Sequence, residues 1–148
     1  MTIVRNILEE NSENKLHTVD VNGTVHDALM LMSAADTGAV LVSENGKIVG
    51  IFTERDYSRN GEVKGRCAKE TPVKEMMTQK MLMVKGDTTA EQCISLMTRY
   101  HVRHLPVIEN DKVIGVVSLR KLAEKVLADH KETIVELENY ILGTGYGQ

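Results

Sequence analysis

The feature that most constrains this chain is a seven-residue stretch that occurs twice. Residues Gly50–Asp56 read Gly-Ile-Phe-Thr-Glu-Arg-Asp, and residues Gly115–Lys121 read Gly-Val-Val-Ser-Leu-Arg-Lys. In each copy an apolar strand runs into a helix whose first residue is Thr or Ser, two of the preferred N-cap types. Backbone N–H groups at such a helix start face outward and can meet an anion. The chain is therefore predicted to be a duplicated unit with a place to hold a nucleotide.

The residues around the two stretches follow one order of elements: strand, helix, strand, strand, helix. Alternating and continuous apolar runs predict the strands of the first unit at residues 17–21, 39–42 and 47–52. The same reasoning predicts the strands of the second unit at residues 82–84, 104–108 and 112–117. Such self-similarity is better explained by duplication than by chance.

Capping pairs predict where the first helix of each unit begins. Thr24 with Asp27 three residues later resembles a capping box, and Thr88 with Glu91 is its expected counterpart. The strands repeat at an offset of 65 residues, whereas these two Thr residues repeat at an offset of 64. We therefore expect one residue to have been gained or lost inside this helix.

Helical patterns also flank the two units. Ile3, Val4, Ile7 and Leu8 share one face of a short N-terminal helix, which we expect to act as a lid or a docking element. From Leu119 to Leu142 the apolar spacing predicts one helix of about 24 residues, or roughly 36 Å. So long a helix exceeds what this domain needs to cover its own core, and its far half is expected to pack on a second chain.

Composition excludes several functional classes. The chain has 148 residues, a net charge of −3, no Trp and a single Phe, so it offers neither the basic patch nor the aromatic platform typical of nucleic-acid binding. No apolar run approaches the roughly 20 residues that span a bilayer, and the N-terminus lacks the order of a signal peptide. We expect a cytoplasmic protein with reduced thiols at Cys67 and Cys93, and no metal site at His101 and His104.

Two ordered groups of residues resemble a known family. Gly-Ile-Phe-Thr-Glu-Arg-Asp-Tyr closes the first unit, and Val-Arg-His-Leu-Pro-Val leads to Gly-Val-Val-Ser in the second. Together, over about residues 17–127, they resemble a CBS domain pair, named after cystathionine beta-synthase, of the small stand-alone type. The resemblance implies two sheets packed pseudo-symmetrically, two clefts between the repeats, frequent dimerisation, and binding of adenine nucleotides such as AMP, ADP, ATP or NAD.

The resulting fold prediction is an α/β (α+β) protein of two pseudo-symmetric β-α-β-β-α repeats with an extended C-terminal helix. We divide the chain into an N-terminal helix (1–16), repeat one (17–64), a linker (65–79), repeat two (80–127) and a C-terminal helical tail (128–148). We expect a homodimer, and we expect any regulated partner to be another protein chain.

The resemblance also implies which residues line the first cleft, because the Thr-x-x-Asp end of one repeat faces the first two strands of the other. The expected lining is Thr53, Arg55, Asp56, Lys80, Met81, Arg103, His104, Leu105 and Pro106. An ionised carboxylate can accept from both ribose hydroxyls, which makes Asp56 the expected sugar ligand. Thr53 with its neighbouring amides, and Arg103, His104 or Lys80, would meet the phosphate. Met81, Leu105 and Pro106 would form apolar walls for the adenine.

Two structural readings compete with this assignment. Thr53 and Asp56 have the spacing of a capping pair, so both could serve the helix alone. Arg103 and His104 are neighbours on a predicted strand and point to opposite faces, so both can reach one phosphate only if the chain bends there.

The second cleft departs from the family pattern. Lys121 stands where repeat one has Asp56, and a lysine cannot accept from a sugar diol. The expected lining is His17, Gly38, Ala39, Ser118, Arg120 and Lys121. Three outcomes stay open for this cleft: it is empty, it holds a more phosphate-rich ligand, or it binds weakly. We expect one good site per chain.

Two functional classes follow. The first is a non-catalytic regulatory module that binds an adenine nucleotide in the cleft between the repeats. The alternative is a nucleotide-independent dimerisation or partner-docking module. We do not expect an enzyme, because no nucleophile is paired with a base and no set of metal ligands is present.

Overall fold

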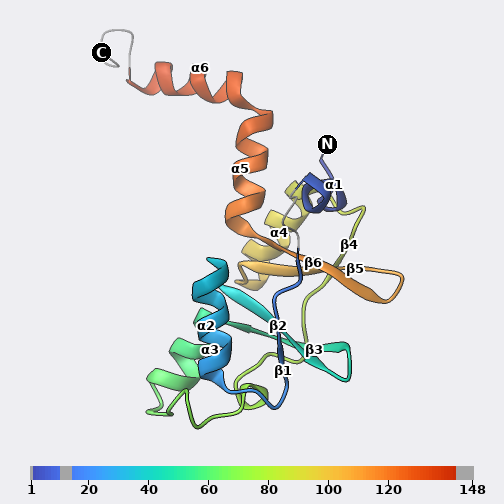
Figure 1. The fold of residues 1–148 in the computed structure, drawn as a ribbon. Coiled ribbons are helices and arrows are strands. Elements are labelled where there is room, and N and C mark those ends of the chain that lie inside the picture. Colours follow the sequence, from blue (N-terminus) through green and yellow to red (C-terminus); the bar gives the residue numbers. More distant parts are fainter. Residues whose placement is uncertain (1, 11–14, 143–148) are drawn as a thin grey trace.

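The computed structural model describes residues 2–10 and 15–142 and shows two three-stranded sheets (Figure 1). The first sheet has the order β1 (Thr18–Asp20), β2 (Ala39–Glu44) and β3 (Lys47–Thr53). The second has the order β4 (Val84–Lys85), β5 (His104–Glu109) and β6 (Lys112–Ser118). In each sheet the first pair of strands is parallel and the second pair antiparallel. The predicted α/β fold of two pseudo-symmetric repeats is confirmed. Residues 1, 11–14 and 143–148, which belong to the predicted N-terminal region and C-terminal tail, lie outside the described residues.

The helices α2 (Val25–Ala35) and α4 (Ala90–Tyr100) correct the predicted cap of the second unit. Thr24 caps α2 with Asp27, as expected, but α4 is capped by Thr89 with Gln92, not by Thr88 with Glu91. The Thr89 hydroxyl accepts from the Gln92 N–H at 3.1 Å, and the Gln92 side chain accepts from the Thr89 N–H at 3.0 Å. The offset is therefore 65 residues in the helices as well as in the strands, and no residue was gained or lost.

Strand β4 is shorter than its counterpart β1 because of Pro106. In repeat one, the Leu41 N–H donates to the His17 carbonyl at 2.9 Å, just before β1 begins. Pro106 occupies the position equivalent to Leu41 and has no N–H to donate. The carbonyl of Leu82, equivalent to His17, therefore lacks this donor, and parallel pairing starts only at Val84.

Three groups of buried side chains hold the molecule together. One lies within repeat one and includes Phe52, Val25 and Val40. The second lies within repeat two and includes Leu105 and Leu122. The third joins the two sheets and consists of Ala39, Leu41 and Ile51, with Ile48, Met81, Val113 and Val116 packed against them. Because this third group binds the sheets face to face, the space beside it lies between the repeats.

The N-terminal helix α1 (Val4–Glu10) belongs to the core of repeat two, where Val4, Ile7 and Leu8 are buried. The first residue of α1 is hydrogen-bonded to repeat two in the same way as the first residue of the short helix η2 (Val73–Glu75) is hydrogen-bonded to repeat one. The Val4 N–H donates to the Thr88 carbonyl at 2.8 Å, and the Val73 N–H donates to the Gly23 carbonyl at the same distance. Each repeat is thus completed by the segment that precedes the other repeat. Helix α1, before repeat one, packs on repeat two, and η2, in the linker before repeat two, packs on repeat one.

The closing helices of the two repeats differ in length. Helix α3 (Glu54–Tyr57) has four residues and continues as the π-helix η1 (Ser58–Glu62), whereas α5 (Leu119–Asp129) has eleven. The helical pattern predicted from Leu119 to Leu142 is present, but it forms two helices, α5 and α6 (Lys131–Leu142), with His130 between them at φ −115° and ψ 27°. The expected single long helix was wrong in this respect. Figure 1 shows α6 turned sideways at the end of α5 and directed away from both sheets.

Candidate functional site

A cleft of about 1030 Å³ lies between the two repeats. Repeat one contributes the end of β3 and the helical segment after it, and repeat two contributes the loop between α4 and β5. The segment that leads into repeat two, residues 78–82, supplies the remaining wall. The lining consists of Gly38, Ile51, Thr53, Glu54, Arg55, Asp56, Ser58, Arg59, Thr78, Lys80, Met81, Leu82, Tyr100, His101, Val102, Arg103, His104 and Pro106.

Asp56 lies in this cleft with its two carboxylate oxygens in different situations. Oδ2 accepts from the Thr53 N–H at 3.0 Å and from the Thr53 hydroxyl at 3.1 Å, while the Asp56 N–H donates back to that hydroxyl oxygen at 3.1 Å. Oδ1 has only a long contact, 3.4 Å, from the Thr78 hydroxyl. The structural reading of Thr53 and Asp56 as a capping box is therefore correct, and it uses one carboxylate oxygen while the other retains acceptor capacity.

The segment that carries Thr78 and Lys80 reaches the cleft because Gly50 permits a close backbone approach. Ile51 and Thr78 exchange both backbone hydrogen bonds, at 3.0 and 2.8 Å. A Cβ atom on Gly50 would stand 2.8 Å from the sulfur of the flexible Met77 side chain and 3.0 Å from the Thr78 carbonyl oxygen, tighter than most real Cβ contacts. Glycine at this position therefore gives residues 77–78 the room to pair along the edge of β3.

Positive charge predominates along the cleft. Four cationic side chains, Arg55, Arg59, Lys80 and Arg103, face two carboxylates, Glu54 and Asp56. Among the described residues, the ion pairs are formed by other side chains, and none of these four cations takes part in one. Cationic groups without an ion-pair partner are free to interact with an anionic ligand.

His104 occupies the first position of β5 and borders two cavities. The chain bends at Arg103, so both Arg103 and His104 line the first cleft, as the sequence required if they are to share a ligand. Gly38 makes room for the imidazole, because a Cβ atom there would lie 3.2 Å from His104 Cε1. Burial lowers the pKa of His104 below its ordinary value, and the adjacent Arg103 guanidinium lowers it further.

The structure brings together all but one of the residues predicted for the first cleft. Leu105 is the exception: its side chain is fully buried in the core of repeat two, because successive residues of β5 point to opposite faces. Apolar wall residues that the sequence analysis missed are Ile51, Leu82 and Val102. Arg59 was also missed, although its position four residues after Arg55 places both on one helical face.

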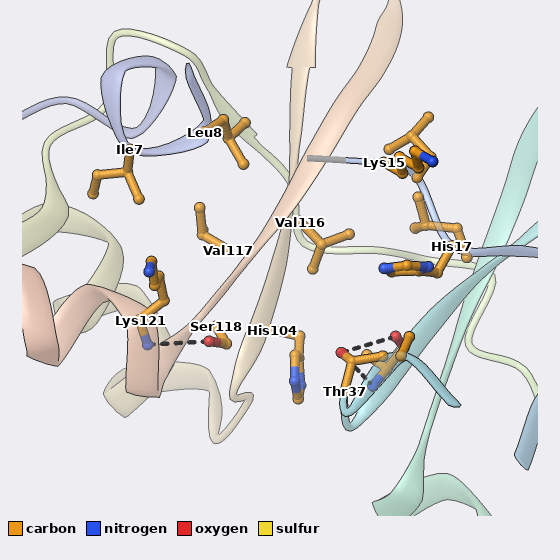
Figure 2. Close-up of a pocket in the computed structure, with 14 residues that line it drawn as sticks. Ile7, Leu8, Lys15, His17, Thr37, His104, Val116, Val117, Ser118 and Lys121 are labelled. Atoms are coloured by element: carbon orange, nitrogen blue, oxygen red, sulfur yellow. Dashed lines mark hydrogen bonds between the residues drawn. The ribbon is translucent and has the colours of Figure 1, made fainter. Parts of the chain in front are cut away.

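The second cleft is smaller, about 230 Å³, and Figure 2 shows it bordered by α1, the segment before β1, and the start of α5. His17, Ala39, Ser118 and Lys121 line it as predicted. Two predicted residues do not. Gly38 faces the first cleft, and Arg120 forms an ion pair with Glu124 at 3.3 Å, with its side chain 85% exposed.

Two differences distinguish the second cleft from the first. Ile7 and Leu8 of α1 occupy one side of it, and no residue there corresponds to the acceptor at Asp56. Lys121 stands in that place, and its backbone N–H donates to the Ser118 hydroxyl at 3.1 Å. Figure 2 shows His104 between Ser118 and Thr37, and the same residue also lines the first cleft. This cavity combines cationic side chains with a small volume.

Other chemistry-bearing groups lie outside both clefts. Burial raises the pKa of the Cys93 thiol to about 11, whereas Cys67 is exposed. The described residues contain no group of three or more His, Cys, Asp or Glu side chains placed to hold a metal ion. Across residues 2–10 and 15–142, every helix is too short or too polar to cross a lipid bilayer.

Comparison with known proteins identifies the type of module. The family model described as CBS domain matches twice, at residues 4–60 and 73–128. The chain belongs to the CBS-domain family. The two matches begin at Val4 and Val73, the two residues whose N–H groups anchor α1 and η2 to the repeats.

Relatives of this CBS pair include proteins from plants and bacteria. The chain is 38% identical over 128 residues to the mitochondrial CBS domain-containing protein CBSX3 of Arabidopsis thaliana, covering 83% of this chain and 62% of that protein. It is 39% identical, with a TM-score of 0.83, to a solved protein with CBS domains from Burkholderia ambifaria, covering 86% and 96% of the two chains. A CBS domain pair solved with 5'-methylthioadenosine and S-adenosyl-L-methionine has the same fold, with a TM-score of 0.75 at 19% identity over 87% and 98%.

These relatives are CBS-domain proteins, as is the present chain, and a CBS pair is a regulatory module. Its two clefts are not equivalent, since the larger one has an acceptor carboxylate and unpaired cations, and the smaller one has a lysine in place of the carboxylate.

Proposed function

We propose that this CBS pair binds an adenine nucleotide, AMP, ADP, ATP or NAD, in the first cleft and acts as a sensor that regulates another protein, without chemistry of its own. The observation that carries the proposal is the set of groups that share the cleft. A carboxylate oxygen with spare acceptor capacity, apolar side chains and four cations without ion-pair partners line one space of about 1030 Å³. A nucleoside phosphate has complementary groups: sugar hydroxyls, a flat base and an anionic phosphate.

The sugar end of the ligand would meet Asp56. Its Oδ1 can accept from two ribose hydroxyls, while Oδ2 stays in the capping box and holds the carboxylate in a fixed orientation. Thr53 contributes to the site by orienting Asp56. The Thr53 hydroxyl already donates to Oδ2 and accepts from the Asp56 N–H, so it is engaged in the cap. This is a narrower role than the phosphate contact expected from the sequence.

The phosphate end would meet the cations. Arg103 and Lys80 lie on the repeat-two side, and Arg55 and Arg59 lie on the repeat-one side. A phosphate group between them would be neutralised by charge-assisted hydrogen bonds, which are stronger than neutral ones. Because the cations come from both repeats, a bound phosphate would favour the arrangement in which the repeats are close together, and this is how occupancy could reach a partner protein.

The base would lie against apolar side chains. Ile51, Met81, Leu82 and Val102 line the cleft without a competing charge. The Leu82 carbonyl lacks the donor that repeat one supplies at the equivalent position, because Pro106 has no N–H. A free carbonyl at the edge of an apolar wall suits the exocyclic amino group of adenine, which is a donor.

Isothermal titration calorimetry on the intact chain tests the proposal. We expect AMP, ADP, ATP or NAD to bind in the micromolar to millimolar range, and GMP, which has a carbonyl in place of the amino group, to bind more weakly. The proposal is contradicted if none of the four adenine nucleotides binds at millimolar concentration.

One observation favours the alternative of a dimerisation or docking module. Helix α6 exposes apolar side chains, with Tyr140 87% and Ile141 78% exposed. We keep as proposals a homodimer, an effector protein as the regulated partner, and the cytoplasm as the location. Light scattering after size exclusion separates the two functions: the docking module requires that Tyr140→Glu with Ile141→Glu alters assembly, while nucleotide binding in the cleft should be unaffected.

A further inference from the structure

The loop from His101 to His104 supplies most of the repeat-two wall of the first cleft. All four of its residues line the cleft. The loop begins at the C-cap of α4, where His101 adopts the left-handed conformation with φ 56°. The position of this loop therefore determines how wide the cleft is on the repeat-two side.

Repeat one has the equivalent loop, Asp36 to Ala39, with the same internal hydrogen bonds. The Val102 N–H donates to the Met97 carbonyl at 3.1 Å, and the Thr37 N–H donates to the Met32 carbonyl at 3.0 Å. At the far end of each loop, the first residue of the closing helix donates to the loop: Leu119 to the Arg103 carbonyl at 2.8 Å, and Glu54 to the Gly38 carbonyl at 3.0 Å. The two loops are therefore held alike by their own repeats.

The two loops differ in one contact across the repeats. Arg55 Nη1 of repeat one donates to the His101 carbonyl of repeat two at 2.7 Å. The equivalent arginine, Arg120, instead donates to Glu124 of its own helix, at 3.3 Å, and the equivalent carbonyl, that of Asp36, does not receive this bond. Asp36 has the same left-handed conformation, with φ 51°, so backbone geometry does not account for the difference.

We propose that Arg55 is a positioning residue that fastens the two walls of the first cleft together before any ligand arrives. A guanidinium hydrogen-bonded to a carbonyl at a helix C-terminus is favoured both by charge assistance and by the helix dipole. One of its five donors is used on His101, and the side chain also lines the cleft. The inference rests on the proposed nucleotide site and adds to it that Arg55 acts on the whole ligand, by setting the separation of the walls, and not on the phosphate alone.

Arg55→Ala and Arg120→Ala form a matched pair for the test. The two arginines occupy equivalent positions in the two repeats, but only Arg55 forms a hydrogen bond to the other repeat. In the ligand-free protein, hydrogen exchange of the peptide that includes His101 and Val102 should become faster in Arg55→Ala, by about threefold to tenfold, the range for one such hydrogen bond. Arg120→Ala should leave this exchange unchanged. Equal exchange in the two variants would overturn the proposal, whether or not any nucleotide binds.

A second measurement separates positioning from direct contact with phosphate. Adenosine has no phosphate, so a residue that only contacts phosphate cannot alter its affinity. We expect Arg55→Ala to weaken adenosine by about threefold to tenfold and AMP by at least as much, and Arg120→Ala to weaken neither. An unchanged affinity for adenosine together with weaker AMP binding would show that Arg55 is a phosphate ligand and would refute positioning. Failure of the wild type to bind either compound refutes the proposed function and leaves the exchange measurement to decide on Arg55.

Discussion

Replacing Asp56 by Ala is the most informative perturbation, because the chain contains a matched control for its structural effect. Asp56 closes a capping box with Thr53, and Asp27 closes the same kind of box with Thr24, where its Oδ2 accepts from the Thr24 N–H at 3.1 Å. Asp56 lines the first cleft, whereas Asp27 lines neither cleft. Each substitution should destabilise the fold by about 1 kcal/mol, or about 2–4 °C in Tm for a chain of this size.

The effect on ligand binding should differ between the two variants. At a nucleotide concentration of about 100 times the wild-type Kd, binding stabilises the protein by about 2.7 kcal/mol, equivalent to roughly 5–11 °C. Two sugar hydroxyls bonded to one carboxylate account for at least about 100-fold in affinity, since each hydrogen bond to a charged group contributes about 1.5–3 kcal/mol. In Asp56→Ala the same concentration then equals or falls below the Kd, and the stabilisation falls to about 0.4 kcal/mol or less, at most roughly 1 °C.

Thermal melts followed by circular dichroism, with and without AMP or NAD, provide the assay. Asp27→Ala should have a lower Tm than the wild type without ligand, and the ligand should raise its Tm by as much as it raises that of the wild type. The reasoning fails if Asp56→Ala keeps that increase too, or if Asp27→Ala loses as much of it, because the carboxylate would then act only through its helix.

Three further predictions follow. Titration calorimetry should give one nucleotide per chain, because Lys121 replaces the acceptor of Asp56 in the second cleft; two sites of equal affinity would contradict this. Because the folded-state pKa of His104 is lowered, the unfolded chain binds its proton more readily, so urea melts should show stability falling as pH drops through about 6.5. His104→Gln should flatten that dependence, and an identical pH profile would refute the assignment. Iodoacetamide at pH 8 should modify exposed Cys67 quickly and Cys93 only after unfolding, because burial raises the pKa of Cys93 to about 11; rapid modification of both thiols in the folded protein would be inconsistent with this core.

The two repeats could be predicted from the sequence for two reasons. Strands and helices have different apolar patterns, and the strands of one repeat recur in the other at a constant offset of 65 residues. The capping error arose because Thr88 and Thr89 are adjacent and each is followed, three residues later, by a residue that can complete a box. Tertiary burial decides between them: a cap at Thr89 places Ala90, Cys93 and Met97 in the core. A single sequence does not contain that information.

The other errors have a common cause, which is dependence on contacts between distant segments. No Gly or Pro near His130 indicates that the helix ends there. Helix α5 packs on the core of repeat two, whereas none of the described side chains of α6 is buried. Leu105 was assigned to the cleft from a resemblance, whereas the pleat of β5 directs it into the core. The bond between Arg55 and His101 joins residues 46 positions apart and leaves no local signal.

A crystal structure of the protein grown with excess AMP or NAD would test the central claim most directly. The account predicts density in the first cleft, with the sugar hydroxyls on Asp56 Oδ1 and the phosphate among the cations contributed by both repeats. A first cleft that contains only water under these conditions, with Asp56 bonded to the amide and hydroxyl of Thr53 and to no sugar, would contradict it.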